Sequence, residues 1–545
     1  MRALIPVLET GSSSTILAPP ANPRLRIGKL CVAIQGSEPA KLIERAEAAL
    51  ADSKFIEFRL DSLPKPALAL AKVKDFLAAH REATAIATCR RKENGGNFTG
   101  SFKAELELLA NAAEAGCQIV DLEVESAEEA SAKQLDQLRA SLRASGTALL
   151  ISFHDFKRTK DLEQAAKRIE AFRPDFIKLV STAKSLADNL AVLRLIEDRS
   201  RSSEVVGIAM GEEGLVSRVL GLRAGAAFTF ASYSGGPEAE SNLATATGHA
   251  TAPGQVTART LRELYRVEQL DQATRIFGVA GNPIAHSLSP LMQNTAFRRE
   301  NVNAVMIPLK VHRLTDLLTL ARELPLAGVA VTMPLKQEVQ PHLANPSRSV
   351  LDTLTHRIGA CNTLRTGADG KLYGFNTDVD GVVRPLEKRL KLKGARIAVL
   401  GAGGAARAAV FGLAAQGAEV FVVNRTHENA VKLARQAKVH VLKHELLAKN
   451  RFDVLINATP CGMAGSKQQL PIEENELNAG LVFDMVYNPL ETPLLKLAKE
   501  RGLAVIRGLE MFVQQGARQF EIWTGKPAPE AEMLRVVELE LRRRG

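Results

Sequence analysis

The sequence contains few aromatic residues: Phe, Trp and Tyr make up 5% of its 545 residues, with a single tryptophan. Proteins that bind single-stranded nucleic acids stack successive bases on aromatic side chains, so this scarcity argues against such a function. Long basic runs are also absent, and the largest cluster, Arg542-Arg543-Arg544, is interpreted as a solvated helix end. The diffuse formal charge of +11 instead favours anionic small substrates or a phosphorylated cofactor. We expect no nucleic-acid partner.

Cysteine is also scarce, and its positions are scattered, odd in number and without a CxxC pair. The five positions are Cys31, Cys89, Cys117, Cys361 and Cys461. This pattern excludes a disulfide framework and a cysteine-based zinc site, and it fits a reducing compartment. We therefore expect a cytoplasmic protein without a metal.

No apolar run reaches 18 residues, so the sequence predicts no membrane span. Residues 1–26 lack the apolar core of a secretory signal peptide and are predicted to form an N-terminal extension. They are poor in acidic residues, which leaves an organelle transit peptide as the alternative.

Between residues 27 and 268, short apolar or β-branched runs alternate with amphipathic segments. The runs are predicted strands: Leu30–Ile34, Phe55–Phe58, Ala85–Thr88, Ile119–Leu122, Ala148–Ser152, Phe176–Val180, Val205–Ala209 and Ala226–Phe230. The segments are predicted helices: 39–51, 67–80, 102–115, 127–144, 160–172, 185–199 and 213–224, with a last one after Pro253. Eight strand–helix repeats predict an α/β fold of the (β/α)8 TIM-barrel type; a doubly wound open sheet is the alternative.

One lysine, Lys178, interrupts an otherwise apolar predicted strand. Burial disfavours an ammonium group, and an amine kept partly neutral attacks ketones to form a Schiff base. A snorkelling lysine on an edge strand is the structural alternative. In a TIM barrel the chemistry lies at the strand C-termini. Here those ends carry Glu57, Arg59, Asp61, Arg90, Asp121, Glu123, His154 and Lys178. Together these groups suit an anionic keto substrate, imine formation and proton transfer by a histidine.

The motifs at these positions resemble type I 3-dehydroquinate dehydratase across the whole first half. They are Phe55–Asp61, Thr88-Cys89-Arg90 with Gly95-Gly96, Ser152–Asp155, Lys178, Glu213–Arg218 and Ala252–Gln255. The resemblance implies that Lys178 forms an imine with the C3 ketone of 3-dehydroquinate. It implies that His154 removes a C2 proton and protonates the departing C1 hydroxyl. It also implies a set of residues that hold the substrate: Glu57, Arg59, Arg90, Arg218, Thr251 and Gln255.

Two positions depart from that family. Its members usually carry a glutamate directly before the Gly-Gly pair, where it supports the histidine, whereas this chain has Asn94, with Glu93 one place earlier. Asparagine supplies no charge, so His154 is expected to titrate lower than in a relative with the glutamate. Thr251 replaces a serine and keeps the hydroxyl group.

A second unit is predicted after a boundary near 268–274, where the strand Arg275–Ala280 follows a predicted helix over 255–269. Further on, the predicted strand Leu392–Leu400 leads into Gly401-Ala402-Gly403-Gly404-Ala405-Ala406, a G-x-G-x-x-A loop. Its glycines permit a tight turn and close approach of a pyrophosphate at a helix N-terminus.

The next predicted strand, Glu419–Val423, ends in Asn424-Arg425-Thr426. An NAD-binding fold would place Asp or Glu there for the ribose diol, whereas arginine suits a 2′-phosphate, so NADP(H) is the expected cofactor. A surface arginine is the structural alternative. The expected cofactor contacts are Gly401, Ala402, Gly403, Gly404, Ala405, Asn424, Arg425 and Thr426. Asn429, four residues after Arg425, supplies no second positive charge, which predicts a milder preference for NADP over NAD.

The second half resembles shikimate dehydrogenase over its whole length. Besides the glycine loop, the motifs are Gly281–Pro290, Val329–Lys336, Ala360–Thr363, Phe375–Asp378 and Gly508–Met511. The resemblance implies hydride transfer between NADPH and the C3 carbonyl of 3-dehydroshikimate, with Lys336 and Asp378 as the catalytic pair. The implied substrate contacts are Ser287, Ser289, Thr332, Asn362, Tyr487 and Gln515. The structural alternative for the Ser289-Pro290 pair is a helix N-cap followed by proline at the first helical position.

The sequence therefore predicts a dehydratase barrel over 27–268 and a dehydrogenase over 272–545, in the order of the plant fused enzyme. The dehydrogenase is divided into a substrate lobe (272–385 and 508–545) and a Rossmann-type NADP-binding lobe (386–507). A quinate-catabolic dehydrogenase fusion and a regulatory pseudoenzyme are the alternatives. Arg425 argues against the first, and Lys178, His154, Lys336 and Asp378 argue against the second. A monomer that acts on small molecules is compatible with these features.

Overall fold

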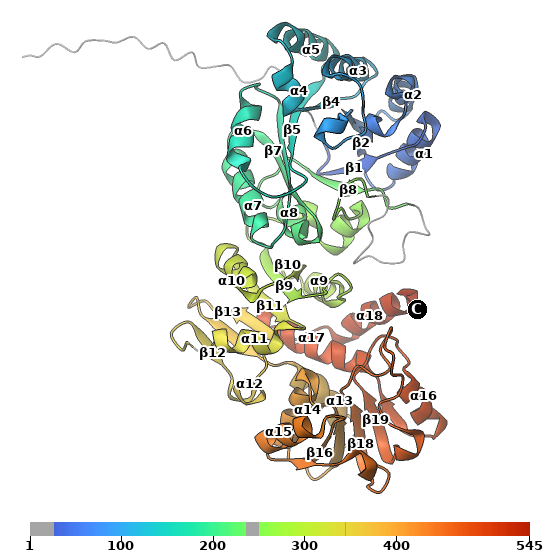
Figure 1. The fold of residues 1–545 in the computed structure, drawn as a ribbon, viewed down its shortest axis with the longest axis vertical. Helices are drawn as coiled ribbons and strands as arrows, with labels where there is room; N and C mark the ends of the chain where they lie inside the picture. Colours follow the sequence, from blue (N-terminus) through green and yellow to red (C-terminus); the bar gives the residue numbers. More distant parts are fainter. Residues whose placement is uncertain (1–24, 26, 236–249, 344, 545) are drawn as a thin grey trace, which may run out of the picture.

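The computed structural model describes residues 25, 27–235, 250–343 and 345–544, so most of the expected extension 1–26 lies outside the described residues. Within these ranges the chain forms three sheets of eight, six and six strands. In Figure 1 the eight-stranded sheet lies at one end of the molecule, the first six-stranded sheet in the middle and the second at the other end.

The first sheet is a nearly closed parallel barrel. Its strands are β1 (Leu30–Ile34), β2 (Phe55–Arg59), β3 (Thr84–Thr88), β4 (Ile119–Glu123), β5 (Ala148–His154), β6 (Phe176–Thr182), β7 (Glu204–Met210) and β8 (Thr229–Ser232). They follow one another in the order β7-β6-β5-β4-β3-β2-β1-β8. β7 and β8 approach where the Ala227 amide donates to the Val205 carbonyl at 2.8 Å. The predicted barrel is confirmed, and the open sheet is excluded.

Helices surround these strands (Figure 1). They are α1 (Pro39–Ala49), α2 (Leu70–Ala79), α3 (Phe102–Glu114), α4 (Val124–Glu129), α5 (Ala132–Ser145), α6 (Leu162–Glu170), α7 (Asp188–Arg199) and α8 (Leu215–Leu220). Each repeat follows from the alternation of buried strand and amphipathic helix that the sequence shows.

Two barrel helices differ from the prediction. The segment 127–144 is divided because Ala130 is extended and Ser131 begins α5 with a capping box to Gln134. The helix expected over 255–269 is reduced to a short segment that is π-helical at Thr260–Leu264. Arg266 then adopts a left-handed conformation, with φ of 53°, which interrupts the helix.

The middle sheet is mixed, with the order β10-β9-β11-β13-β14-β12. Its strands are β9 (Arg275–Gly281), β10 (Ala304–Lys310), β11 (Leu326–Val331), β12 (Ser349–Leu351), β13 (Thr363–Thr366) and β14 (Leu372–Phe375). Its helices are α9 (Ser289–Arg299), α10 (Leu314–Glu323), α11 (Leu335–His342) and α12 (Thr353–Ile358), joined from the C-terminus by α17 (Gly508–Thr524) and α18 (Glu530–Arg544). Trp523 on α17 donates to the Leu364 carbonyl at 2.9 Å, which ties the returning helix to this lobe.

The last sheet is parallel, with the order β17-β16-β15-β18-β19-β20 that is typical of dinucleotide-binding folds. Its strands are β15 (Arg396–Leu400), β16 (Glu419–Val423), β17 (His440–Val441), β18 (Phe452–Asn457), β19 (Ala479–Asp484) and β20 (Ala504–Ile506). Its helices are α14 (Gly404–Ala415), α15 (His427–Ala437) and α16 (Pro493–Glu500), and α13 (Asp378–Glu387) enters from the middle lobe.

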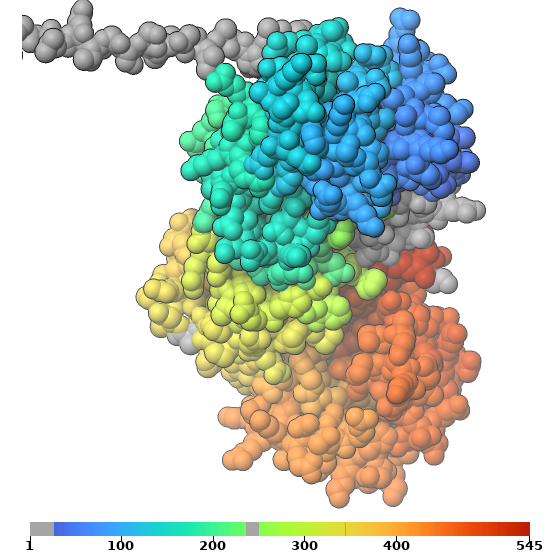
Figure 2. Space-filling view, turned by 45° about the horizontal axis from the view of Figure 1, so that its top comes forward, coloured from blue at the N-terminus to red at the C-terminus, as the bar shows by residue number. Residues whose placement is uncertain are grey.

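The barrel and the middle lobe pack directly on each other (Figure 2). One apolar cluster includes Leu220 of α8 in the barrel together with Ile307 and Leu309 of β10. Helix α8 contacts β10, and α9 contacts the π-helical segment that ends the barrel. The two halves are therefore in direct contact through apolar side chains.

Candidate active sites

Lys178 extends from the middle of β6 into the barrel mouth, where its surroundings are charged rather than apolar. Its Nζ donates to Asp121 Oδ2 at 2.7 Å and lies 3.6 Å from Glu57 Oε1. The same Nζ lies 4.3 Å from the centroid of the Phe230 ring, which belongs to β8. The lysine is 4% exposed. The sequence correctly indicates a buried lysine, but the ion pair replaces the apolar setting that the strand suggested.

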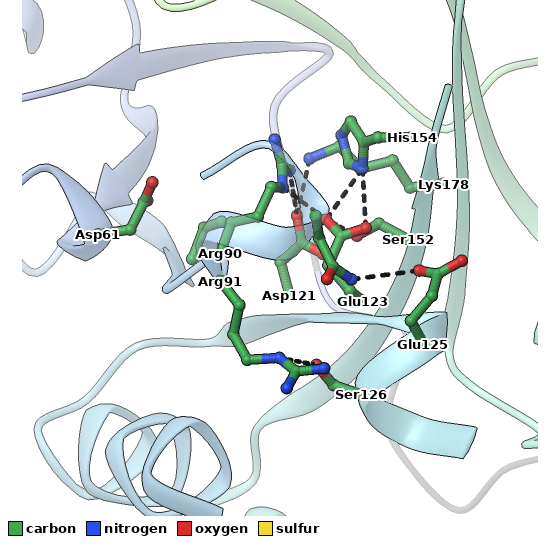
Figure 3. Close-up of polar contacts among 12 residues, drawn as sticks. Asp61, Arg90, Arg91, Asp121, Glu123, Glu125, Ser126, Ser152, His154 and Lys178 are labelled. Carbon is green, nitrogen blue, oxygen red and sulfur yellow. Dashed lines mark hydrogen bonds and ion pairs between the residues drawn. The ribbon is translucent and has the colours of Figure 1, made fainter. Parts of the chain in front are cut away.

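His154, at the end of β5, is held by a carboxylate from the neighbouring strand β4 (Figure 3). Its Nδ1 lies 2.9 Å from Glu123 Oε1 and 3.1 Å from Oε2. Ser152 Oγ donates to the same carboxylate at 3.0 Å. Because Nδ1 faces Glu123, the other ring nitrogen is left to exchange a proton with a ligand.

The pKa of His154 is held well below its usual value, first by burial and then by the positive charges of Arg90 and Lys178. The imidazole is therefore neutral at neutral pH and able to accept a proton. Phe156 stacks on the ring at a centroid distance of 5.9 Å and covers one of its faces.

Asn94 does not serve His154. Its side-chain amide donates to Glu125 Oε2 at 3.3 Å, on a different carboxylate from the one that holds His154. The expectation that Asn94 occupies the supporting position of the family's glutamate is wrong for this chain. Glu123 provides the carboxylate instead, and it also accepts from Arg90 Nε at 2.5 Å.

Two arginines of the expected substrate set are already paired with carboxylates. Arg59 donates to both oxygens of Asp61 at 2.9 Å. Arg90 lies between Glu123 and Asp121, 3.8 Å from the latter. Glu57 accepts from Thr88 Oγ1 at 2.7 Å and faces the lysine. Burial of so many charges requires such pairing, because an unpaired buried ion costs several kcal/mol or more.

Arg218, on α8, has no carboxylate partner in the described part of the chain. Its Nη2 donates to the Pro253 carbonyl at 3.1 Å, while its buried Nε donates to nothing there. Burial lowers the pKa of Arg218 to about 10. Gln255 is also buried and accepts from the Thr251 amide and hydroxyl at 2.8 and 3.0 Å. The structure thus brings the Thr251–Gln255 loop to a guanidinium with free hydrogen-bonding capacity.

The sequence places Asp121 and Glu123 at the rim and Ser152 in a motif, but it assigns none of the three an individual role. The sequence contained a signal for a shared role, because Asp121 and Glu123 are two residues apart at the end of one strand and their side chains therefore lie on the same face. Behind them, Arg91, Glu105 and Ser126 form a buried cluster in which Ser126 donates to Glu105 at 2.6 Å. Burial outweighs the hydrogen bond from Ser126 and the charge of Arg91, and it raises the pKa of Glu105 to about 8.

The second half contains another lysine–aspartate pair. Lys336 Nζ, on α11, donates to Asp378 Oδ2 at 2.6 Å, at the first residue of α13. Asn362 Nδ2 donates to the other oxygen, Oδ1, at 2.9 Å. The aspartate is nearly buried, whereas the lysine side chain is 22% exposed and open to a ligand. These three predicted residues therefore converge.

Further contacts fix this group. Asn362 Oδ1 accepts from the Thr377 amide at 2.8 Å and from Thr363 Oγ1 at 2.9 Å. Gln519 on α17 donates to Thr363 Oγ1 at 3.1 Å. Thr332 immediately precedes the segment that leads to Lys336, and its amide donates to the Ala280 carbonyl at 2.9 Å. Asn362 thus connects the ends of these strands to Asp378, the aspartate that the sequence predicts to be catalytic.

The turn before α9 holds Ser287 and Ser289, but Ser289 is not its N-cap. The helix begins at Ser289, and Ser287 Oγ accepts from the Ser289 amide at 3.3 Å. The capping explanation for the Ser289 hydroxyl is therefore wrong. Arg544, interpreted as solvated, instead donates to the His286 carbonyl in this turn at 3.2 Å.

Tyr487 and Gln515 are not bound to the lysine–aspartate pair. Tyr487 stacks on Phe512 at a centroid distance of 4.8 Å, and burial raises the pKa of its hydroxyl. Gln515 donates to the Phe512 carbonyl at 2.9 Å. Their expected contacts with substrate stay predictions.

The glycine loop between β15 and α14 fits a dinucleotide. Gly401 has φ of 113°, which favours glycine, and Gly403 and Gly404 have no heavy atom within 4 Å of a hypothetical Cβ. That open space lies at the N-terminus of α14, which attracts phosphates. Arg425, after β16, is exposed, and within the described ranges it makes no hydrogen bond or ion pair. Asn424 Nδ2 donates to the Thr426 carbonyl at 2.9 Å and shapes the turn.

Family comparisons match both halves of the chain. The model of type I 3-dehydroquinase matches residues 30–272. The shikimate dehydrogenase substrate binding domain matches 279–364, shikimate/quinate 5-dehydrogenase matches 385–473, and the shikimate 5'-dehydrogenase C-terminal domain matches 508–538.

Individual relatives agree with these matches. The chloroplastic bifunctional 3-dehydroquinate dehydratase/shikimate dehydrogenase of Arabidopsis thaliana is 32% identical over 96% of this chain and 85% of its own length. An NADP(+) shikimate dehydrogenase of Methanosarcina acetivorans is 40% identical over 49% of this chain and 98% of its own. The shikimate 5-dehydrogenase structure from Thermus thermophilus with NADP(H) and shikimate is 34% identical over 49% and 99%, with a TM-score of 0.45.

A barrel with a buried lysine and a dinucleotide-binding half with a lysine–aspartate pair define a fused lyase and oxidoreductase. The chain belongs to the family of bifunctional 3-dehydroquinate dehydratase/shikimate dehydrogenase enzymes. It is an enzyme of the shikimate pathway that dehydrates 3-dehydroquinate and reduces the product to shikimate. Among the described helices, none has the length and apolar character needed to cross a membrane.

The low pKa of His154 leads to a prediction about the dehydratase. A general base works in its deprotonated form, so kcat/KM should be maintained below pH ~6.5, the usual range of histidine, and should fall only as pH drops through the depressed pKa. Glu123→Gln removes a negative charge beside the ring, so it should move this acidic limb lower still and reduce kcat about tenfold or more. Asn94→Glu is the matched control and should leave the limb in place. An upward shift with Asn94→Glu would contradict the observed partner of His154.

Proposed function

We propose that Lys178 is the nucleophile and His154 the proton-transfer group of the dehydration. The observation that supports this most directly is their placement on adjacent strands, β6 and β5, in one buried mouth where the Lys178 amine is bound to Asp121. Attack of the amine on the ketone, with loss of water, gives a protonated imine that withdraws electrons from C2. His154 takes the C2 proton and returns it to the departing C1 hydroxyl, which leaves as water. Hydrolysis of the imine then frees Lys178.

We propose that the remaining polar groups orient the ring. Arg218 has an unused donor, so it would bind the substrate carboxylate, with Gln255 and Thr251 at the adjoining hydroxyls. Asp121 would receive the proton that Lys178 loses before it attacks, because the two groups are 2.7 Å apart. Arg59, Arg90 and Glu57 would complete the wall of the site.

In the second half, Lys336 and Asp378 would move the proton at the substrate oxygen during reduction. Their separation of 2.6 Å allows direct transfer between them, and Asn362 fixes the rotamer of the aspartate. Ser287 and Ser289 would bind the carboxylate at the start of α9, and Thr332, Asn362, Tyr487 and Gln515 would border the ring. When bound, NADPH supplies the hydride.

NADP(H) would lie on Gly401–Ala405, with its 2′-phosphate at Arg425 and flanking contacts to Asn424 and Thr426. The open space beside Gly403 and Gly404 and the free guanidinium of Arg425 support this placement. Relatives named shikimate dehydrogenase (NADP(+)) support NADP(H) as the cofactor.

We propose that the protein is located in a reducing compartment, because all five thiols are buried and unpaired. The cytoplasm is the first candidate. The Arabidopsis relative is named chloroplastic, so a plastid is the second candidate. Imaging of the tagged full chain distinguishes them.

Imine formation at Lys178 can be trapped. Borohydride added during turnover of 3-dehydroquinate should reduce the imine to a stable amine, inactivate the dehydratase and add substrate mass at Lys178. Lys184→Met, which changes the exposed lysine just beyond β6, should leave the labelling intact, while Lys178→Met should abolish it. Shikimate oxidation should survive the treatment. Mass on another lysine would overturn the assignment.

The lysine–aspartate pair of the second half can be tested separately. Lys336→Ala and Asp378→Asn should each reduce shikimate oxidation by roughly 10²–10⁴-fold, the usual contribution of acid–base groups, with dehydration unchanged. Lys388→Ala breaks an exposed lysine–glutamate pair in the same half and serves as control. A loss below about tenfold would reduce the residue to a positioning role.

Arg425 should set the choice of cofactor. Arg425→Ala should weaken NADP binding by about 1.5–3 kcal/mol, the range for hydrogen bonds to charged groups, with little effect on NAD. Arg435→Ala changes another exposed arginine, on α15, about 12 Å along that helix from its first residue, and should affect neither cofactor. Equal losses of NADP and NAD affinity, measured by titration calorimetry, would instead assign Arg425 to the fold.

A further inference from the structure

The two halves meet through charged groups at the rim where β7 ends. Glu212 and Glu213 follow β7 on the catalytic side of the barrel, in a helical turn over Glu212–Gly214. Lys310, the last residue of β10 in the dehydrogenase half, places its Nζ 2.7 Å from Glu212 Oε2 and 3.1 Å from Glu213 Oε1. His312 Nε2 lies 2.9 Å from the same oxygen of Glu213.

Glu213 is the centre of this contact. Its side chain is 14% exposed, far less than that of Glu212 at 62%. Burial alone would raise the pKa of Glu213, but the hydrogen bonds from His312 and Lys310 outweigh it and hold the pKa below its usual value. Its main-chain carbonyl accepts from Asn189 at 2.7 Å, which fixes the turn to the barrel.

On the barrel side, this turn contacts the Thr251–Gln255 loop, which carries residues proposed to bind substrate. The Gly211 amide donates to the Pro253 carbonyl at 3.1 Å, and a Cβ on Gly254 would lie 2.2 Å from the Gly211 carbonyl oxygen. Pro253 also accepts from Arg218, and Gln255 follows two residues later. A shift of the β7–α8 turn therefore displaces the groups proposed to hold 3-dehydroquinate.

On the dehydrogenase side, the contact continues to the second active site. With Nε2–H donated to Glu213, His312 Nδ1 is an acceptor, and Asn282 Nδ2 lies 3.4 Å from it. The Asn282 amide donates to the Met333 carbonyl at 3.1 Å, three residues before Lys336. Asn282 also belongs to the turn that carries Ser287.

We propose that Glu213, which is bound by Lys310 and His312, is a positioning residue. Through it, the dehydrogenase half orders the Thr251–Gln255 loop of the dehydratase. The inference rests on the proposed roles of Arg218 and Gln255. Its physical basis is that the turn after β7 and the Thr251–Gln255 loop are in direct contact. The position of the turn therefore determines the position of the loop. None of the three residues touches substrate; they act by keeping Arg218 and Gln255 in the geometry that binds it.

The expected effect is on substrate binding rather than on chemistry. Lys178, His154 and Asp121 lie on β6, β5 and β4, whereas Lys310 is paired with the turn after β7, so kcat should change by less than about twofold. Because the contact is partly exposed, we expect the dehydratase KM to rise about threefold to tenfold in Glu213→Gln and in Lys310→Met. The second variant lies in the dehydrogenase half, so a change in dehydration would show that the effect crosses the junction.

The experiment uses the full chain and measures dehydration by enone absorbance. Glu213→Gln and Lys310→Met should give the same KM as the double variant, since residues that act through one contact are not additive. Lys310→Arg should restore the original KM. Glu323→Gln, which breaks a separate ion pair across the junction, Arg194–Glu323, is the matched control and should leave both KM and kcat unchanged.

Three outcomes would overturn the inference. They are an unchanged KM in both single variants, an equal rise in the Glu323→Gln control, or additive effects in the double variant. His312→Gln extends the test, since it should also raise the dehydrogenase KM for shikimate through Asn282. Borohydride labelling of Lys178 should persist in every variant, so a failed imine assignment and a failed positioning role give different results.

Discussion

Charge balance inside a water-poor barrel mouth is the constraint on which the first active site depends. Eight ionisable side chains are at most 6% exposed there: Glu57, Arg59, Asp61, Arg90, Asp121, Glu123, Lys178 and Arg218. Desolvation of each ion is costly, so the group is stable only because cations and carboxylates alternate. Arg218 is the exception, with only a backbone carbonyl as partner within the described residues. An anionic substrate would complete the balance, which couples the stability of the mouth to its occupation.

The sequence predicts the barrel well because its signals are local. Each strand is a short apolar run and each helix an amphipathic one, so eight of eight expected strands are present within a few residues. Lys178 and His154 could be located for the same reason, because they lie in or just beyond predicted strands, whereas Lys336 and Asp378 were implied by the resemblance to shikimate dehydrogenase and not by periodicity. Parallel strands then bring their C-terminal ends to one rim, which determines the neighbourhood of the site without further information.

The hydrogen-bond partners of the polar side chains could not be predicted from the sequence. His154 was expected to depend on position 94, yet its partner is Glu123, one strand away and 31 residues earlier. Arg544 resembled a solvated tail but reaches a turn 258 residues away in sequence. The helix expected over 255–269 failed because Arg266 adopts a left-handed conformation that no local signal required. These choices depend on packing between distant segments, which periodicity does not encode.

Both active sites contain a lysine bound to an aspartate, at 2.7 Å in the barrel and 2.6 Å in the dehydrogenase half. The same pair is proposed to do different chemistry, and the surroundings explain why. Lys178 is 4% exposed and backed by Phe230, so a carbonyl that replaces its ion pair meets an amine in a dry site, which suits covalent attack.

The Lys336 side chain is 22% exposed, and its aspartate is held on the other oxygen by Asn362. Water and substrate can reach that amine without breaking the pair, so it is suited to pass a proton rather than to form a bond. Burial and the third partner, more than the identity of the pair, therefore decide which reaction each lysine can support.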